Sequence, residues 1–209
     1  MEGWIGTLAA LALPSEPIVI DGGANKGNVT VRLLAALPRA RIMAFEPQPR
    51  LARKLAKRFR DDPRVAVVAA ALGEEAATLP LTVLSRPTLS SLLLPTGIRD
   101  KYAGQALPVT EIVDVPVVRL DTRLERADII KLDVQGYELP ALRGAADLLP
   151  GVTAVVAETA RYPLYAGQAL LPELEAYLAA YGLVLHGLYD YCRDASGAIA
   201  SGDALFLRK

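Results

Sequence analysis

The sequence has almost no cysteine, no excess of either charge and no long apolar segment. Its single cysteine, Cys192, excludes an intrachain disulfide framework and a multi-cysteine zinc site, and it suits a reducing compartment. The 23 Lys and Arg residues balance the 23 Asp and Glu residues, so no overall field attracts nucleic acid or anionic lipid. No apolar run approaches the roughly 18 residues that span a bilayer, and Glu2 precedes residues 8–13 without the basic flank of a secretory signal. We therefore expect a cytoplasmic protein without a membrane span or a nucleic-acid partner.

What the chain does contain is enough apolar residues for one core. Hydrophobic residues make up 52% of the 209 residues and charged residues 22%, a balance that excludes a disordered chain. No repeat or linker divides the sequence, and this length suits one domain. We expect a single domain over residues 1–209, and the sequence leaves a homodimer open.

Short β-rich runs alternate with helical patterns along most of the chain. Strands are predicted at residues 18–21, 41–46, 65–71, 128–133, 153–158, 183–188 and 204–207. Helices are predicted at residues 27–37 (with Val31, Leu34 and Leu37 as the apolar stripe), 51–59, 139–143 and 171–181. No helix separates the last two strands, so they are expected to be antiparallel. The pattern predicts a doubly wound, Rossmann-like α/β sheet with an antiparallel strand at its C-terminal end.

Residues 78–116 interrupt this alternation. Five prolines punctuate short apolar stretches there, which disfavours a long helix and favours hairpin-like strands. The polar loop at residues 96–107 contains Gly97 and Gly104. Such an insertion could be a lid over a site or an ordinary surface excursion.

A small-residue loop follows the first predicted strand and precedes the first helix. It reads Asp21-Gly22-Gly23-Ala24-Asn25-Lys26-Gly27, which lets the backbone turn tightly and approach a ligand. Free N–H groups of the following helix point at the same place. About 20 residues further on, Glu46 ends the second strand, where a carboxylate can accept hydrogen bonds from both hydroxyls of a ribose.

Two cofactors use this arrangement. A dinucleotide loop needs Gly-x-Gly-x-x-Gly, and a frame anchored on Gly22 meets Ala24 where the second glycine should be. The frame that begins at Asp21 and continues through Gly23 and Asn25 suits S-adenosylmethionine (SAM), whose ammonium Asp21 could help to hold directly or through water. The loop therefore favours SAM over a nicotinamide dinucleotide, with a purely structural turn as the third interpretation.

The residues resemble the FkbM family of SAM-dependent methyltransferases over about residues 17 to 208. Two positions depart from the family pattern: Gln135 stands where the family usually has Glu, and Tyr137 where a small residue is common. Each matching block is modest alone, and the ordered set is specific. The blocks are Val19-Ile20 followed by the loop above, Phe45-Glu46-Pro47, Ile130-Lys131-Leu132-Asp133-Val134-Gln135-Gly136-Tyr137-Glu138, Leu142-Arg143-Gly144, Pro163-Leu164-Tyr165-Ala166-Gly167-Gln168 and Asp203-Ala204-Leu205-Phe206.

The resemblance implies a class I methyltransferase fold, with a seven-stranded sheet whose last pair is antiparallel. It implies methyl transfer to a hydroxyl of a sugar, glycolipid, polyketide or other secondary metabolite, with S-adenosyl-L-homocysteine as the product. By position, the loop would line the methionine part of SAM, Glu46 would hold the ribose, Ala71 and Leu72 would flank the adenine, and Asp133 would lie nearest the methyl. The cofactor-binding residues that we expect are Asp21, Gly22, Gly23, Asn25, Gly27, Glu46, Pro47, Ala71, Leu72 and Asp133.

An aliphatic hydroxyl is a poor nucleophile, so a base or a metal is expected beside it. The candidates near the strand ends are Asp133, Glu138 and Glu158. Asp133 could instead cap the next helix, and Glu138 could be a first-turn acid favoured by the helix dipole. Asp133 and Glu158 together could hold a divalent cation, but no His or Cys supports that site and we assign no metal ligand. His186, inside an apolar strand, is interpreted as structural rather than as a general base.

The sequence thus predicts a SAM-dependent O-methyltransferase with a small-molecule hydroxyl acceptor. The Asp/Asn-Pro-Pro-aromatic tetrad of many amino-group methyltransferases is absent after Asp133, which favours oxygen as the acceptor atom. The alternatives are a nicotinamide-dependent oxidoreductase and a catalytically inactive SAM-binding module.

Overall fold

The computed structural model describes residues 3–96, 107–193 and 196–209. Its helices are α1 (Trp4–Ala9), α2 (Asn28–Ala36), α3 (Pro49–Phe59), α5 (Glu138–Arg143) and α6 (Leu171–Ala179), with 3-10 turns η1 (Pro87–Leu89) and η2 (Leu149–Gly151). Its strands are β1 (Ile18–Gly22), β2 (Arg41–Phe45), β3 (Val65–Val68), β4 (Ala71–Leu72), β5 (Ala77–Leu84), β6 (Val109–Val118), β7 (Ile129–Leu132), β8 (Ala154–Ala160), β9 (Leu183–Arg193) and β10 (Ile199–Arg208).

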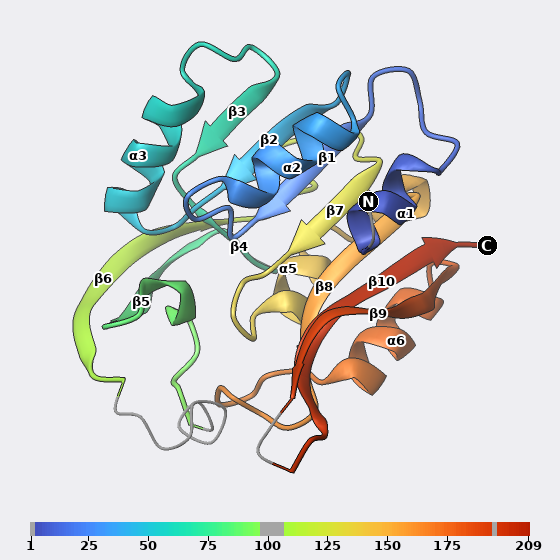
Figure 1. The fold of residues 1–209 in the computed structure, drawn as a ribbon. Coiled ribbons are helices and arrows are strands. Elements are labelled where there is room, and N and C mark those ends of the chain that lie inside the picture. Colours follow the sequence, from blue (N-terminus) through green and yellow to red (C-terminus); the bar gives the residue numbers. More distant parts are fainter. Residues whose placement is uncertain (1–2, 97–106, 194–195) are drawn as a thin grey trace.

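Seven strands form the main sheet, in the order β3-β2-β1-β7-β8-β10-β9 (Figure 1). Strands β3, β2, β1, β7 and β8 run parallel to one another. Strand β10 is antiparallel to β8, and β9 is antiparallel to β10. The predicted doubly wound α/β class is therefore confirmed, including the antiparallel C-terminal pair. Within the described part of the chain, no helix is long and apolar enough to cross a membrane.

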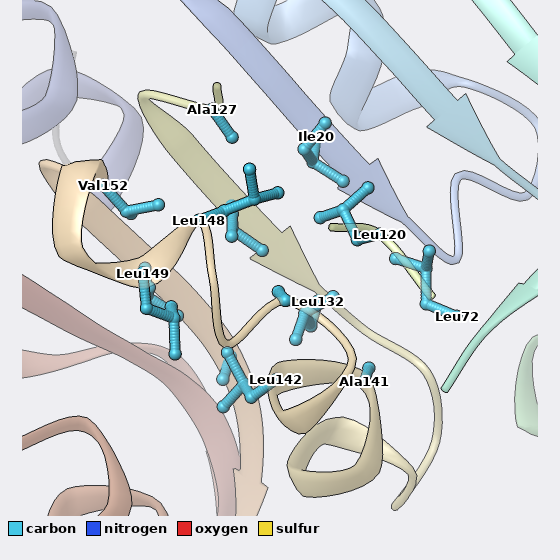
Figure 2. Close-up of a cluster of buried hydrophobic side chains, with 14 of the residues drawn as sticks. Ile20, Leu72, Leu120, Ala127, Leu132, Ala141, Leu142, Leu148, Leu149 and Val152 are labelled. Carbon is cyan, nitrogen blue, oxygen red and sulfur yellow. The ribbon is translucent and has the colours of Figure 1, made fainter. Parts of the chain in front are cut away.

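Alternate residues along the strands pack on opposite faces of this sheet. Val19 and Val156 belong to a buried cluster with α1, α2 and α3. Ile20 and Val155 belong to a second cluster with α5 and α6. Figure 2 shows part of the second cluster, with Ile20 from β1 near Leu120 and with Leu142 from α5. The central strands are apolar on both faces because helices cover both of them.

Helix α2 buries a different stripe from the predicted one. Thr30, Leu33 and Leu34 are buried, whereas Val31 is 41% exposed. Thr30 faces inward because its Oγ1 donates a hydrogen bond of 2.6 Å to Oδ2 of the fully buried Asp21. The prediction was wrong at Val31, because apolar spacing alone does not register a buried polar pair.

Helix α1 was not predicted from the sequence. It buries Trp4, Ile5 and Leu8 against the face of the sheet that α2 also covers. The Trp4 Nε1–H donates a hydrogen bond of 2.8 Å to Asp203 Oδ2 on β10. This bond ties the N-terminal helix to the last strand of the chain.

A second sheet, in the order β4-β6-β5, follows β3. The strand predicted at residues 65–71 therefore divides in two, because β4 leaves the main sheet and pairs parallel with β6. Strands β5 and β6 pair antiparallel, as the hairpin prediction for residues 78–116 requires. Of the polar loop at residues 96–107, for which the sequence leaves both a lid and a surface excursion open, residues 97–106 lie outside the described part of the chain.

Candidate active site

A cavity of about 290 Å³ opens where β1, β2 and β7 end. The loop after β1 forms one wall, and Glu46, Pro47 and the start of β4 form the next. Residues from β5 and from the segment around η1 close a further side, so the insertion contributes directly to the cavity. Lys131, Asp133 and Gln135, at and beyond the end of β7, complete it. Ligands of open α/β sheets bind at this carboxyl edge.

Close packing against neighbouring segments determines the conformation of the glycine loop at residues 21–27. Gly23 has φ +75°, and a Cβ atom there would lie 1.9 Å from the Asp133 carbonyl oxygen. Gly27 has φ +76° and precedes α2, and a Cβ atom there would lie 2.5 Å from the Phe59 ring. Asn25 between them is also left-handed, with φ +51°. Only glycine fits at positions 23 and 27, and the resulting bend presents the backbone of residues 23–26 to the cavity.

Glu46 is held directly against this bend. Its side chain is buried, its Oε2 accepts a 2.8 Å hydrogen bond from the Asn25 N–H, and its Oε1 accepts a 2.9 Å bond from the Gln48 N–H. Burial raises the pKa of Glu46, and the two backbone bonds and the charge of Lys131 offset part of the rise. Each carboxylate oxygen keeps further acceptor capacity. The carboxylate can therefore receive hydroxyl donors from the cavity.

Lys131 is a buried cation beneath the cavity. Its Nζ lies 3.2 Å from Asp21 Oδ1, 3.9 Å from Asp133 Oδ2 and 3.5 Å from the Gly22 carbonyl oxygen. Burial alone would lower the pKa of Lys131, but the carboxylates of Asp21, Asp133 and Asp203 raise it overall. Asp21 itself does not line the cavity. Its carboxylate is engaged by Thr30 and Lys131, so Asp21 acts on the cavity through the lysine that does line it.

Asp133, directly after β7, and Glu158, within the neighbouring strand β8, are bridged by one side chain. The Gln135 Nε2 lies 2.6 Å from Asp133 Oδ1 and 2.5 Å from Glu158 Oε2. The Tyr165 hydroxyl lies 2.8 Å from Gln135 Oε1. Asp133 and Gln135 line the cavity, whereas Glu158 does not. In the sequence, Gln135 stands out only because the family usually has Glu at this position, and no local pattern predicts its contacts with Asp133 and Glu158.

Glu138 supports the turn after β7 from within. It is buried, and its Oε1 accepts hydrogen bonds from the N–H groups of Val134 (3.1 Å) and Gly136 (3.2 Å). Burial raises the pKa of Glu138 to about 7, with a further contribution from Asp133. Glu138 does not line the cavity. His186 is exposed on β9 and does not line the cavity.

The structure brings most of the expected residues to one place. Gly23, Asn25, Glu46, Pro47, Ala71, Leu72 and Asp133 line the cavity, and Asp21, Gly22, Gly27, Glu138 and Glu158 do not. Across residues 3–96, 107–193 and 196–209, no group of three or more His, Cys, Asp or Glu side chains could hold a metal ion. The arrangement offers a buried carboxylate, an exposed backbone bend and apolar walls to an organic cofactor.

Residues 21–185 match the methyltransferase FkbM domain family. The sequence is 30% identical to methyltransferase sdnD of Sordaria araneosa, over 87% of this chain and 77% of that protein. It is 24% identical to the 2-O-methyltransferase NoeI of Sinorhizobium fredii, over 85% of this chain and 77% of that protein.

The fold is similar to that of solved methyltransferases. A crystal structure of an FkbM methyltransferase from Methylobacillus flagellatus matches with a TM-score of 0.61 and 17% identity, over 95% of this chain and 45% of that one. Fibrillarin from Aeropyrum pernix, solved with SAM bound, matches with a TM-score of 0.51 and 15% identity, over 97% of this chain and 73% of that one. The predicted class I methyltransferase fold is thereby confirmed. This chain spans less than half the length of the first of these structures.

Proposed function

The chain belongs to the FkbM family of methyltransferases, and we propose that it uses SAM to methylate a hydroxyl oxygen of a small molecule. The observation that carries the proposal is the position of Glu46. Its buried carboxylate borders the cavity and contacts the backbone bend at Asn25, as a ribose-binding acid in this fold must. Residues 1–209 would form one methyltransferase domain, with the described parts of the insertion at residues 78–116 walling the cofactor cavity.

The residues around the cavity fit SAM in charge and in polarity. Glu46 has acceptor capacity for the ribose hydroxyls, while Ala71, Leu72 and Leu81 offer an apolar wall to the adenine. The bend at Gly23 and Asn25 would hold the methionine part with its backbone. No pyrophosphate-binding Gly-x-Gly-x-x-Gly is present, which counts against a nicotinamide dinucleotide.

When bound, SAM supplies a methyl carbon on a sulfonium, and its transfer forms an O–C bond, breaks an S–C bond and releases the hydroxyl proton. The residues of this chain would orient the acceptor, exclude water and receive that proton. Asp133 is the group that we assign to receive it, because it lines the cavity at the end of β7. Its Oδ1 is held by Gln135, so Oδ2 is the atom that remains for the acceptor. The Lys131 Nζ lies 3.9 Å from Oδ2.

Two observations support oxygen as the methylated atom. The similar protein NoeI is named as a 2-O-methyltransferase. In this chain Asp133 is followed by Val134 and Gln135 rather than by two prolines, so the tetrad of many amino-group methyltransferases is missing. We propose a sugar, glycolipid or other secondary metabolite as the acceptor, and S-adenosyl-L-homocysteine as the product. The cytoplasmic location, the lack of a nucleic-acid partner and the homodimer remain predictions.

Replacing Glu46 tests the cofactor assignment. Glu46→Gln should weaken SAM binding by about 1–3 kcal/mol, measured by titration calorimetry, because a charged acceptor of hydrogen bonds is lost. Glu125→Gln, an exposed acid outside the cavity, is the matched control and should bind SAM like the wild type. Equal affinity of the Glu46→Gln and wild-type proteins would remove Glu46 from the ribose site.

Two further measurements separate the alternatives. Titration with NAD should give no binding, and tight NAD binding without SAM binding would favour an oxidoreductase. SAM carrying a labelled methyl group, incubated with a panel of hydroxylated sugars and metabolites, should yield a labelled product. A chain that binds SAM and labels no acceptor in a crude metabolite extract would be a binding module rather than an enzyme.

A further inference from the structure

Gln135 occupies a strained turn directly beyond β7. Its backbone is left-handed, with φ +54°, and Gly136 follows with φ +94°. A Cβ atom at residue 136 would lie 2.9 Å from the Tyr165 ring, so the turn packs tightly on that ring. A left-handed glutamine is uncommon and is kept only where the surroundings enforce it.

Every polar group of the Gln135 side chain is engaged. The two N–H donors of its primary amide match the two carboxylate oxygens beside them, at Asp133 (2.6 Å) and Glu158 (2.5 Å). Its Oε1 accepts from the Tyr165 hydroxyl at 2.8 Å. The opposite amide orientation would set a carbonyl oxygen against two carboxylates. The chemistry of the partners therefore fixes which end of the amide faces the acids.

The main chain of Gln135 is held as firmly as its side chain. Its carbonyl oxygen accepts a 2.7 Å hydrogen bond from Ser91 Oγ, which in turn accepts from the Leu93 N–H at 3.0 Å. Both serine and glutamine are nearly inaccessible to solvent. The bridging amide is thus anchored by the insertion on one side and by Tyr165 on the other.

Two carboxylates on adjacent strands repel each other unless a proton, a cation or a hydrogen-bond donor lies between them. Here the donor is a neutral amide, which contacts one oxygen of each acid. Asp133 lines the cavity, and its second oxygen, Oδ2, makes no contact with the amide. The place where a divalent cation could bridge Asp133 and Glu158 is filled by the amide nitrogen.

We propose that Gln135 is a positioning residue that takes the place of a bridging metal ion, orienting Asp133 Oδ2 toward the acceptor hydroxyl. The inference deepens the proposed methyl transfer and rests on it for its catalytic meaning. It predicts that wild-type transfer does not need a divalent cation, and that a carboxylate at position 135 would create that need.

The first test is metal binding, which requires no acceptor. Gln135→Glu has nearly the same shape and places a third carboxylate between Asp133 and Glu158. In an electron paramagnetic resonance titration with Mn²⁺ alone, it should bind Mn²⁺ at least tenfold more tightly than the wild type, because three carboxylates suit this ion. Ala176→Glu, which adds the same charge at an exposed site on α6, should bind like the wild type. If circular dichroism shows Gln135→Glu to be unfolded, Gln135→Asp carries the same test.

The second test is catalytic, with labelled SAM and an acceptor from the panel above. Gln135→Leu removes both donors and should lower kcat at least tenfold while the calorimetric affinity for SAM changes less than twofold. Gln135→Glu should be impaired in EDTA and regain activity with Mn²⁺, whereas wild-type activity should be unchanged by EDTA. Loss of wild-type activity in EDTA, or failure of the carboxylate variants to gain Mn²⁺, would overturn the proposal. Failure of the wild type to bind SAM would instead contradict the proposed function. The Mn²⁺ titration needs neither SAM nor an acceptor, so its result would still test the inference about Gln135.

Discussion

At the scale of single residues, the buried Lys131 compensates the negative charge of the carboxylates around it. It neutralises Asp21, which is fully buried, and faces Asp133 at the cavity. Lys131→Met should lower the free energy of unfolding by about 3–5 kcal/mol, because Asp21 would remain buried without its cation. Urea unfolding measures the change. The exposed Lys54→Met is the control and should stay within about 0.5 kcal/mol of the wild type.

The double variant distinguishes the lost pair from lost packing. Asp21→Asn combined with Lys131→Met removes both charges, and the Thr30 hydroxyl can still donate to the amide oxygen at position 21. The double variant should therefore be more stable than Lys131→Met alone. If the second change adds further destabilisation instead, the ion pair is not what the lysine contributes.

The residues of the site were predictable to different degrees. Asp21, Glu46 and Asp133 could be predicted because each ends an apolar strand, and parallel strands bring such ends to one edge. Gln135 could not, because its partners Glu158 and Tyr165 come from a different strand and loop. The contact is set by how the two turns pack, which no local pattern records.

At the scale of elements, helix α3 has an unfavourable charge arrangement at its start. Its first turn carries no acid, and Gln48 provides no side-chain cap, while Arg50 lies near the positive end of the helix dipole. Arg50→Glu should raise the free energy of unfolding by about 0.5–1.5 kcal/mol, measured by urea unfolding. The gain combines the dipole interaction with a new i, i+4 pair to Lys54.

The same helix provides its own control of opposite sign. Lys57 lies in the last turn of α3, where a cation is favourable. Lys57→Glu should lower the free energy of unfolding by about 0.3–1 kcal/mol. A shift in the same direction for Arg50→Glu and Lys57→Glu would mean that net charge, rather than the dipole, controls the stability of this helix.

Element prediction succeeded where burial follows a simple period. The stripe of Leu51, Leu55 and Phe59 is buried in α3 as predicted. It failed where a polar contact competes, as at Thr30, and where a short segment gains its stability from distant partners. Helix α1 has six residues and depends on the bond from Trp4 to β10, and β4 depends on pairing with β6.

At the scale of the whole molecule, the doubly wound sheet collects acids from distant parts of the chain around one cavity. Besides the acids that border it, Glu138 and Asp203 are largely withdrawn from solvent. Burial raises the pKa of Asp203 to about 6, with a further contribution from Asp133, and Lys131 and the Trp4 indole offset part of the rise. Glu46 is displaced in the same direction. Glu138 and Asp203 therefore favour a protonated folded state at mildly acid pH.

The raised pKa values of Glu138 and Asp203 predict how the stability of the protein depends on pH. The pKa of Glu138 is about 7 in the folded chain against an ordinary value of 4.5, and that of Asp203 is about 6 against 3.8. Between pH 5 and pH 7 the folded chain therefore binds more protons than the unfolded chain, and raising the pH favours unfolding. The stabilisation from Glu138 and Asp203 is fully present below their pKa values in the unfolded chain. It is lost as the pH rises through their pKa values in the folded chain. The Arg64 guanidinium lowers the pKa of Asp62, so Asp62 changes the free energy of unfolding only below about pH 4 and not between pH 5 and pH 7.

Urea unfolding at pH 5, 6, 7 and 8 should thus show the free energy of unfolding falling by about 1–3 kcal/mol over this range. Glu138→Gln should flatten the slope, because the amide oxygen can still accept from the Val134 and Gly136 N–H groups but no longer titrates. The exposed Glu125→Gln should leave the slope unchanged. A stability that rises from pH 5 to pH 8 in the wild type would show that Glu138 and Asp203 are already charged in the folded protein. The buried acids around the cavity would then be held by stronger donors than the hydrogen bonds described for them.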